Sequence, residues 1–353
     1  MNWKFEWITN WETIYSESFQ KQWLLWVNKA QNSHIFFHPK LSMAWIESYS
    51  QIWHIAPHFC IATFNGNLIF FPLVKITKNY KSFFHQILAP IGISSFDYLD
   101  PLIVGEEKNL LISFFNELIS EIKSIKSDIT YFSGLHQSLN FPGLILKGKE
   151  QCYYTNLENF KNSAEELLND MKPKNRREHQ RVERRLLELG EISFECIYDN
   201  KLNLLSDELN LFKKHYRQRW PNAFFAPGFH DKVVFNGIEN ELVRFSQLKL
   251  ENISIGWAID LKWKDRYYAY MHTYDINYVS YAPGRMHLME RIKLAFKEKY
   301  AHFDLLTGSE TYKSEWFNNC EIIHNYQLNS INFGPAIRNK LNQIKSKIKS
   351  YHG

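Results

Sequence analysis

The chain has 353 residues, 45% of them hydrophobic and 16% aromatic, which is enough for two domains with cores of their own. The formal net charge of +5 is modest for this length, so it argues against a DNA-binding protein, while local clusters of Lys and Arg indicate an anionic ligand or surface. Four scattered cysteines without a Cys/His cluster at metal-ligand spacing suggest neither a disulfide framework nor a zinc site. No signal-like or membrane-spanning run is evident, so we expect a cytoplasmic protein.

The N-terminal half, residues 1–150, is expected to begin with two helices and to continue with three strands, a helix and a strand. Apolar residues recur at helical spacing from Trp11 to about Asn28, and Pro39 suits the first turn of a second helix. Three strand patterns follow, with the hairpin signal Asn65-Gly66 between the first two, at residues 59–64, 68–76 and 83–91. This half closes with a predicted helix and a predicted strand, at residues 106–125 and 129–132.

A helical region that is rich in arginine links the halves, at about residues 163–190. Ser163, with Glu166 three residues later, is typical of a capping box, and Pro173 interrupts or restarts the helix. The region ends at Gly190, a residue that commonly follows a helix.

Five arginines fall within ten residues of this linking helix, from Arg176 to Arg185, with two glutamates among them. Such a run is often a solvated face. Because the mutual repulsion of the arginines is only partly offset, an anion would relieve it, and the arginine fork suits phosphate or carboxylate. We therefore assign Arg177 and Arg181 to a substrate-binding site as the functional alternative.

The second half, residues 151–353, repeats the order of the first. After a strand at 192–198 and two helices, one of which ends near Trp220, three antiparallel strands are predicted at 242–250, 253–263 and 266–274. A loop, a helix at 285–300 and a strand at 302–306 complete the set. The recurring order indicates an α/β (α+β) protein with two similar domains, 1–150 and 151–353, each a mixed, mainly antiparallel sheet flanked by helices.

Two features of the second half indicate ligands or surfaces. The Pro283-Gly284 turn opens the helix at 285–300, and free backbone N–H groups at a helix start are a natural seat for a phosphate or pyrophosphate. The tail, at about 335–350, is a basic amphipathic helix, which we expect to dock on the protein itself or, alternatively, to touch an acidic membrane surface.

Several stretches, taken in order, resemble one protein family. They are SYAPGRMHLMERI and AHFDLLTGSETYKSEW, preceded by NRREHQRVERRLLELGEISFE and HYRQRW, with FFHPKLSMAWIESY, LIFFPLV and FDYLDPLIVG in the first half. They look like the acetyltransferase-type proteins grouped with a cellulose-biosynthesis protein, within the GNAT superfamily. The resemblance implies tandem GNAT-like domains related to the enzymes that transfer aminoacyl groups onto peptidoglycan precursors.

The resemblance also implies an acyl donor, acetyl-CoA or another acyl-CoA, whose pyrophosphate lies at the loop before the second-half helix. The matching positions are Tyr281, Ala282, Gly284, Arg285 and Met286. This loop departs from the superfamily pattern, because few of its residues are small and its proline lacks an N–H. An aminoacyl-tRNA donor, as in the peptidoglycan relatives, therefore stays open.

Four residues are candidates for the chemistry. Lys313, in a polar loop after the last core strand, resembles a lysine that the peptidoglycan relatives place near the reacting carbonyl. His272 is a candidate base and Tyr274 a candidate acid for a leaving thiolate; both are equally compatible with packing roles. Asp304 is predicted to orient Lys313 or a water, or else to cap backbone.

Arg219 and Trp220 complete the set of predicted substrate-binding residues, as an anion contact and a stacking wall. No Gly-x-Ser-x-Gly or Cys/His signature is present, which favours direct acyl transfer. The sequence thus predicts an N- or O-acyltransferase acting on a small molecule or a surface-glycan precursor. The alternatives are an aminoacyl-tRNA-dependent transferase and a non-catalytic module that binds an anionic ligand.

Overall fold

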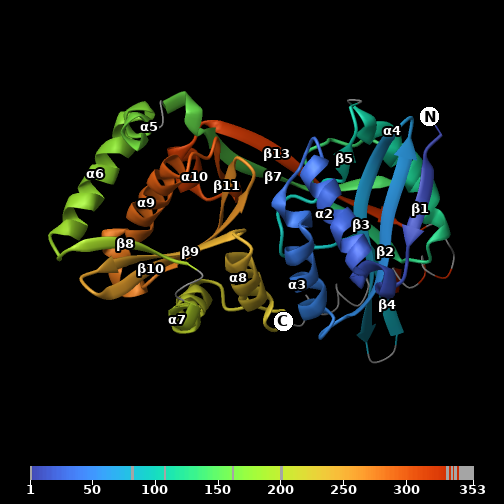
Figure 1. The fold of residues 1–353 in the computed structure, drawn as a ribbon, viewed down its shortest axis with the longest axis horizontal. Helices are drawn as coiled ribbons and strands as arrows, with labels where there is room; N and C mark the ends of the chain where they lie inside the picture. Colours follow the sequence, from blue (N-terminus) through green and yellow to red (C-terminus); the bar gives the residue numbers. More distant parts are fainter. Residues whose placement is uncertain are drawn as a thin grey trace. The chain divides into compact units, whose positions relative to one another are not determined.

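The computed structural model describes residues 2–330 apart from 81–82, 107–108, 161–162 and 199–201, together with positions 334, 337, 340 and 341. The chain divides into two compact units (Figure 1). Unit 1 comprises Met1–Lys149 and Ile322–Gly353, and unit 2 comprises Glu150–Glu321. The sequence prediction assigned everything after residue 150 to the second domain, whereas the segment from Ile322 returns to unit 1 because its strand pairs there with residues 129–135.

Unit 1 is a mixed sheet with the strand order β1-β2-β3-β4-β6-β13, in which β5 pairs with β3. Its neighbours are antiparallel except for β4 and β6. The strands are β1 (Lys4–Ile8), β2 (His54–Phe64), β3 (Asn67–Tyr80), β4 (Phe83–Pro90), β5 (Leu102–Val104), β6 (Ile129–Leu135) and β13 (Asn319–Asn329). The helices are α1 (Trp11–Tyr15), α2 (Glu17–Lys29), α3 (Pro39–Tyr49) and α4 (Leu110–Glu121).

The predicted hairpin of unit 1 is confirmed. Asn65 and Gly66 have φ values of +46° and +78°, which is the pattern of a type I′ turn, and Phe64 pairs with Asn67 across it. Aromatic side chains of α2 and the sheet fill the core, where Trp23 lies edge-on to Phe59 at 5.2 Å between ring centroids.

Unit 2 is a second mixed sheet, ordered β7-β12-β11-β10-β9-β8. The three antiparallel strands and the final strand that the sequence predicts are found within about one residue of their predicted bounds. The strands are β7 (Leu144–Asn156, which begins in unit 1), β8 (Ile192–Ile197), β9 (Val243–Leu250), β10 (Ile253–Trp263), β11 (Arg266–Tyr274) and β12 (His302–Thr307). The helices are α5 (Ala164–Asp170), α6 (Pro173–Leu187), α7 (Leu202–Arg219), α8 (Phe229–Glu239), α9 (Pro283–Lys297) and α10 (Thr311–Trp316).

The arginine-rich region is two helices, as its capping signals predict. The Ser163 hydroxyl accepts from the N–H groups of Glu165 and Glu166 at 3.2 and 3.4 Å, and Pro173 occupies the first turn of α6. Helix α6 ends at Leu187, and Leu189, in the turn that follows, is 40% exposed.

The predicted basic helix at about 335–350 lies outside the described residues, except for positions 337, 340 and 341. Within the part of the chain that is described, no helix has the length and apolar character needed to cross a bilayer.

Candidate functional site

The sheet of unit 2 opens between its two parallel strands. In the described chain, β11 and β12 pair at Arg266–Tyr268 against His302–Asp304, although β11 continues to Tyr274 and β12 to Thr307. Asp304 is fully buried; its Oδ1 accepts from the Leu306 N–H at 2.8 Å, and Leu306 has a φ of +58°. This local turn ends the regular course of β12, so the strands separate beyond Asp304.

A cavity of about 220 Å³ lies in this gap. Its wall comes from β11 and β12, from the N-terminal half of α9, from the end of α7 and from α10. The sequence-predicted residues that line it are Arg219, His272, Tyr274, Ala282, Gly284 and Arg285. Sequence reasoning therefore named a set of residues, distant along the chain, that the fold brings together.

Three arginines lie in the cavity wall, and they differ in their partners. Arg291 is paired with Asp260, and Arg285 with Glu315. Arg219 lies over the rings of Trp220 and Tyr274, at 4.5 and 5.0 Å, and makes no ion pair with any acid among the described residues. The cavity therefore carries a cationic excess at the end of α7.

The buried pair is part of a small network beneath the cavity. Arg291 Nε donates to both oxygens of Asp260, at 3.1 and 2.9 Å, and the Tyr267 hydroxyl donates to Asp260 Oδ2 at 2.9 Å. All three residues are at most 1% exposed. The Asp260 carboxylate neutralises the charge of Arg291. The pair therefore adds no net charge to the cavity wall, and Arg291 can contribute N–H donors there.

His272 faces the cavity as a neutral imidazole. Burial, with the nearby charges of Arg291, Arg219 and Lys313, lowers the pKa of His272 to about 3. Its ring meets that of Tyr312 edge-on, at 5.8 Å between centroids. The sequence argument for His272 as a base took its pKa to be near its ordinary value; the structure makes it a hydrogen-bond acceptor of low basicity.

The start of α9 offers few backbone donors. Ala282 precedes the helix in the left-handed region, with a φ of +47°; Pro283 has no N–H, and the N–H of Arg285 donates to the Ala282 carbonyl at 3.0 Å. Nη1 of Arg285 is buried and has no hydrogen-bond partner among the described residues. An anion at this turn would therefore be held mainly by guanidinium groups.

Two of the predicted cofactor residues pack elsewhere. Met286 belongs to an apolar cluster with Leu186, against which Tyr281 also packs. The Tyr281 ring lies 5.1 Å beneath the guanidinium of Arg185, which also donates to the Ser280 carbonyl at 3.2 Å. These contacts fasten the loop before α9 to α6.

Lys313 lies on the short helix α10 and not in the polar loop that the sequence indicated. Its side chain is 6% exposed. The ammonium donates to the Thr307 carbonyl and lies 3.4 Å from Glu310 Oε2, so it fastens the turn that follows β12. Helix α10 has six residues, too few for a clear periodic signal.

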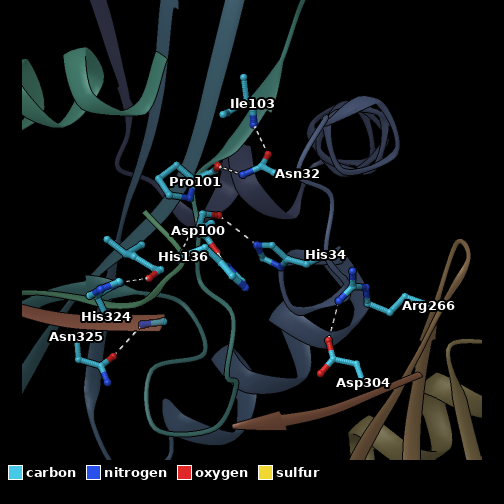
Figure 2. Close-up of polar contacts among 12 residues, drawn as sticks. Asn32, His34, Asp100, Pro101, Ile103, His136, Arg266, Asp304, His324 and Asn325 are labelled. Carbon is cyan, nitrogen blue, oxygen red and sulfur yellow. Dashed lines mark hydrogen bonds and ion pairs between the residues drawn. The ribbon is translucent and has the colours of Figure 1, made fainter. Parts of the chain in front are cut away.

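Asp304, another of the four predicted catalytic residues, is held in place by neighbouring groups. Besides the Leu306 N–H, it binds Arg266, whose Nη1 lies 2.8 Å from Asp304 Oδ2 (Figure 2). Its place at the strand separation corresponds to the backbone-capping alternative.

Arg177 and Arg181, predicted to bind substrate, lie on the exposed face of α6. Arg177 Nε donates to the Pro173 carbonyl at 3.2 Å. Arg181 binds Glu178 through two hydrogen bonds of 3.0 and 2.7 Å, which lower the pKa of Glu178. Neither arginine lines the cavity, and neither does Trp220, which is 38% exposed with Arg219 over its ring.

The cavity residues that sequence reasoning missed include Arg291, Tyr312 and Trp316. One signal was present. Arg291 falls among the apolar positions of its helix, and Asp260 falls within the apolar strand IGWAIDL. Opposite charges at interior positions of two adjacent elements predict a buried pair.

Unit 1 has a polar cluster of its own, shown in Figure 2. Asp100 Oδ1 accepts from the His136 N–H at 2.8 Å, and Asp100 Oδ2 lies 2.6 Å from His136 Nδ1. His34 Nε2 lies 3.1 Å from the Asp100 carbonyl, and Asn32 bonds the backbone of Pro101 and Ile103 at 2.8 and 2.9 Å. The described residues contain no His, Cys, Asp or Glu group suited to a metal ion. The cluster fixes residues 100–103 against the segment between α2 and α3, which carries Asn32 and His34.

One known family matches the part of the chain that contains most of the cavity wall. Residues 173–314 match a family described as an acetyltransferase (GNAT) domain. This range contains every residue of the cavity wall except Trp316. No curated protein sequence matches the chain.

Several solved structures are similar in fold over most of the chain. A conserved protein of unknown function from Bacteroides thetaiotaomicron is 11% identical, with 92% of this chain and 100% of that one covered at a TM-score of 0.56. FemX is 10% identical; the match covers 88% of this chain and 96% of FemX, and the TM-score is 0.56. A third match is the C-terminal domain of a putative lysylphosphatidylglycerol synthetase from Agrobacterium fabrum, which is 10% identical. This match covers 92% of this chain and 96% of that domain, and the TM-score is 0.51. The predicted α/β (α+β) fold class, with mixed, mainly antiparallel sheets flanked by helices, is confirmed, and the GNAT match lies within the second half.

Proposed function

We propose that this protein, which carries a GNAT acetyltransferase domain in residues 173–314, transfers an acyl group from acyl-CoA to an amine or hydroxyl. The proposed acceptor is a small molecule or a surface-glycan precursor in the cytoplasm, because the proteins that the sequence resembles are associated with surface polysaccharides. The observation that carries the proposal is the cationic cavity in the gap between β11 and β12, at the start of α9.

The residues of the cavity fit the parts of an acyl-CoA. Ala269, Leu288 and Leu305 give it an apolar wall, suited to the thin pantetheine arm. Arg219, without an acidic partner among the described residues, and the unpartnered Nη1 of Arg285 suit the phosphate oxygens. These side chains take the place of backbone donors that Pro283 and the engaged Arg285 N–H do not supply.

Direct transfer needs an attacking amine or hydroxyl, a donor for the developing oxyanion and a proton for the departing thiolate. No Ser or Cys lines the described cavity, in agreement with attack by the acceptor itself. The new C–N or C–O bond forms as the C–S bond breaks, and the acceptor proton ends on the thiol.

Individual residues receive roles from their positions. His272, neutral because its pKa is lowered to about 3, accepts a hydrogen bond from an acceptor amine that enters uncharged. The Tyr274 hydroxyl gives its proton to the thiolate and regains one from the acceptor nitrogen or oxygen, so that the acceptor proton ends on the thiol and Tyr274 is neutral again. We keep Lys313 as a predicted contributor of positive charge, and Asp304 as a positioning residue that separates the strands.

A second donor is favoured by the shared fold with FemX and by the resemblance to the peptidoglycan transferases. In that alternative an aminoacyl-tRNA supplies the acyl group. Its mark would be copurifying tRNA, with an affinity that falls steeply as salt rises.

The test is binding and turnover with the purified protein. Acetyl-CoA and longer acyl-CoAs in large excess over their Kd should raise Tm by several degrees. When a panel of amine acceptors is added, at least one combination of acyl-CoA and acceptor should release free thiol. Absence of both a Tm shift and thiol release for every acyl-CoA would reject the proposal. Transfer from aminoacyl-tRNA alone would establish the second donor.

A further inference from the structure

We propose that the exposed side of α6 docks on the surface of a bilayer that contains anionic lipids. The side consists of a basic face, defined as Lys174, Arg177, Arg181 and Arg184, and of an aliphatic edge, defined as Leu187, Leu189 and Ile253. All seven side chains are exposed. The inference concerns unit 2 outside the cavity and does not depend on the acyl donor.

The basic face is a straight stripe along the helix. Its members follow one another at spacings of three, four and three residues, which places them on one side of an α-helix. The buried residues of α6, His179, Val182 and Leu186, occupy the opposite side. The packing of α6 in unit 2 therefore presents the stripe to solvent.

The charge of this helix is concentrated and mostly uncompensated. Pro173–Leu187 contains six Lys and Arg and two Glu, a net charge of +4, where the whole chain has +5. Glu178 binds Arg181, but Arg177 and Arg184 donate to carbonyls of their own helix, those of Pro173 and Gln180. An anionic surface would supply the negative charge that the two glutamates of this helix provide only in part.

The aliphatic edge lies at the C-terminal end of the stripe. Leu187 and Leu189 are 51% and 40% exposed, and Ile253 is 63% exposed. The turn after α6 reaches the strand that carries Ile253: the Glu191 N–H donates to Glu251 Oε1 at 2.8 Å. Leu250, the last residue of β9, pairs with both Ile192 and Ile253. The first residues of β8 and β10 therefore lie on either side of the same end of β9.

This combination favours lipid over nucleic acid as the partner. Basic side chains beside exposed aliphatic ones suit a headgroup region, where the charges meet anionic lipids and the aliphatic groups enter the acyl boundary. Single-stranded nucleic acid would call for exposed aromatic rings among the cations, and the face and edge contain none.

The test is cosedimentation of the full-length protein with vesicles. One set is phosphatidylcholine with about 30% phosphatidylglycerol and the other is phosphatidylcholine alone. The variant Lys174→Glu/Arg177→Glu/Arg184→Glu is compared with Lys4→Glu/Lys29→Glu/Lys126→Glu, which makes the same charge change at exposed positions of unit 1. Both must keep the wild-type Tm, so that loss of fold is separated from loss of binding.

We expect the wild type to bind the anionic vesicles and release them as salt rises to about 300 mM. The α6 variant should bind at least about 100-fold more weakly, since each of the three basic residues near such a surface contributes about fivefold to the affinity. The unit 1 variant should change little. Leu187→Ser/Leu189→Ser should weaken binding while keeping its salt dependence.

Equal binding to both vesicle types, or equal loss in the two charge variants, would overturn the proposal. So would retention of tRNA, but not vesicles, in an α6-dependent manner, because the basic face would then serve nucleic acid. If the α6 variant unfolds, Arg177→Gln/Arg184→Gln replaces it, with an expected loss of about tenfold or more.

Discussion

The guanidinium of Arg291 and the carboxylate of Asp260 form a bidentate, fully buried ion pair under the cavity of unit 2. The pair joins α9 to the centre of β10, so the helix that carries the proposed donor loop is fastened to the sheet by charge as well as by apolar packing. Its energetic value depends on both partners being present.

We predict that Arg291→Met lowers the free energy of unfolding by about 3–5 kcal/mol, because it leaves the Asp260 carboxylate buried and unpaired. The double variant Arg291→Met/Asp260→Leu should be more stable than Arg291→Met. Urea denaturation measures both. Additive losses in the double variant would contradict the coupling.

Arg219 is predicted to hold phosphate at the cavity. Arg219→Ala should weaken acetyl-CoA binding by about tenfold or more, the loss of one charge-assisted hydrogen bond. Arg217→Ala is the matched control: Arg217 lies on the same helix with its guanidinium 5.2 Å from the Phe224 ring and outside the cavity wall. Isothermal titration calorimetry measures each Kd, and an equal effect of the two substitutions would count against the assignment.

Buried histidines predict a loss of stability in acid. Burial lowers the pKa of His34, His179 and His230 to about 4, and burial with nearby cations lowers that of His272 to about 3. The unfolded chain therefore binds more protons than the folded one below about pH 6.5, and stability falls as pH decreases toward 4.

Urea denaturation at about pH 7.5 and pH 5 should show a decrease of several kcal/mol. His272→Asn should remove up to about 2 kcal/mol of that decrease. A pH-independent stability over this range would show that these imidazoles are not neutralised by folding. The pH profile of turnover above pH 5 should likewise lack an inflection from His272.

Lys313 is predicted to act on the chemical step. Lys313→Met keeps the aliphatic stem on α10 and removes the ammonium from Thr307 and Glu310. We expect kcat to fall by at least about tenfold, with the Kd for acetyl-CoA changed less than about threefold. An unchanged kcat would contradict a role in the chemical step and would show that Lys313 only stabilises the turn after β12.

What the sequence predicted well depends on local signals. The Asn65-Gly66 turn and the alternation on either side of it specify a hairpin between neighbours, and the same holds for the three strands before Asp275. In contrast, β13 pairs with β6, nearly 200 residues away, and β7 has the largely exposed pattern LILKGKEQCYYTN. Neither strand carries a turn or a clean alternation that would reveal its partner.

The candidate site divides in the same way. Residues next to the Pro283-Gly284 turn and at the end of β11 were found, because a loop signal and a strand period place them. Arg291, Tyr312 and Trp316 reach the cavity from helices whose rotation the packing sets. Arg177 and Arg181 were assigned to a ligand site from charge alone, and charge does not specify which side of α6 faces the sheet.

The most direct test of the central claim, an acyl donor in the gap between β11 and β12, is hydrogen–deuterium exchange with and without saturating acetyl-CoA. The proposed function predicts slower exchange in residues 269–274 and 279–286, at the end of β11 and the start of α9. Exchange that is unchanged in both segments while acetyl-CoA is bound would contradict it.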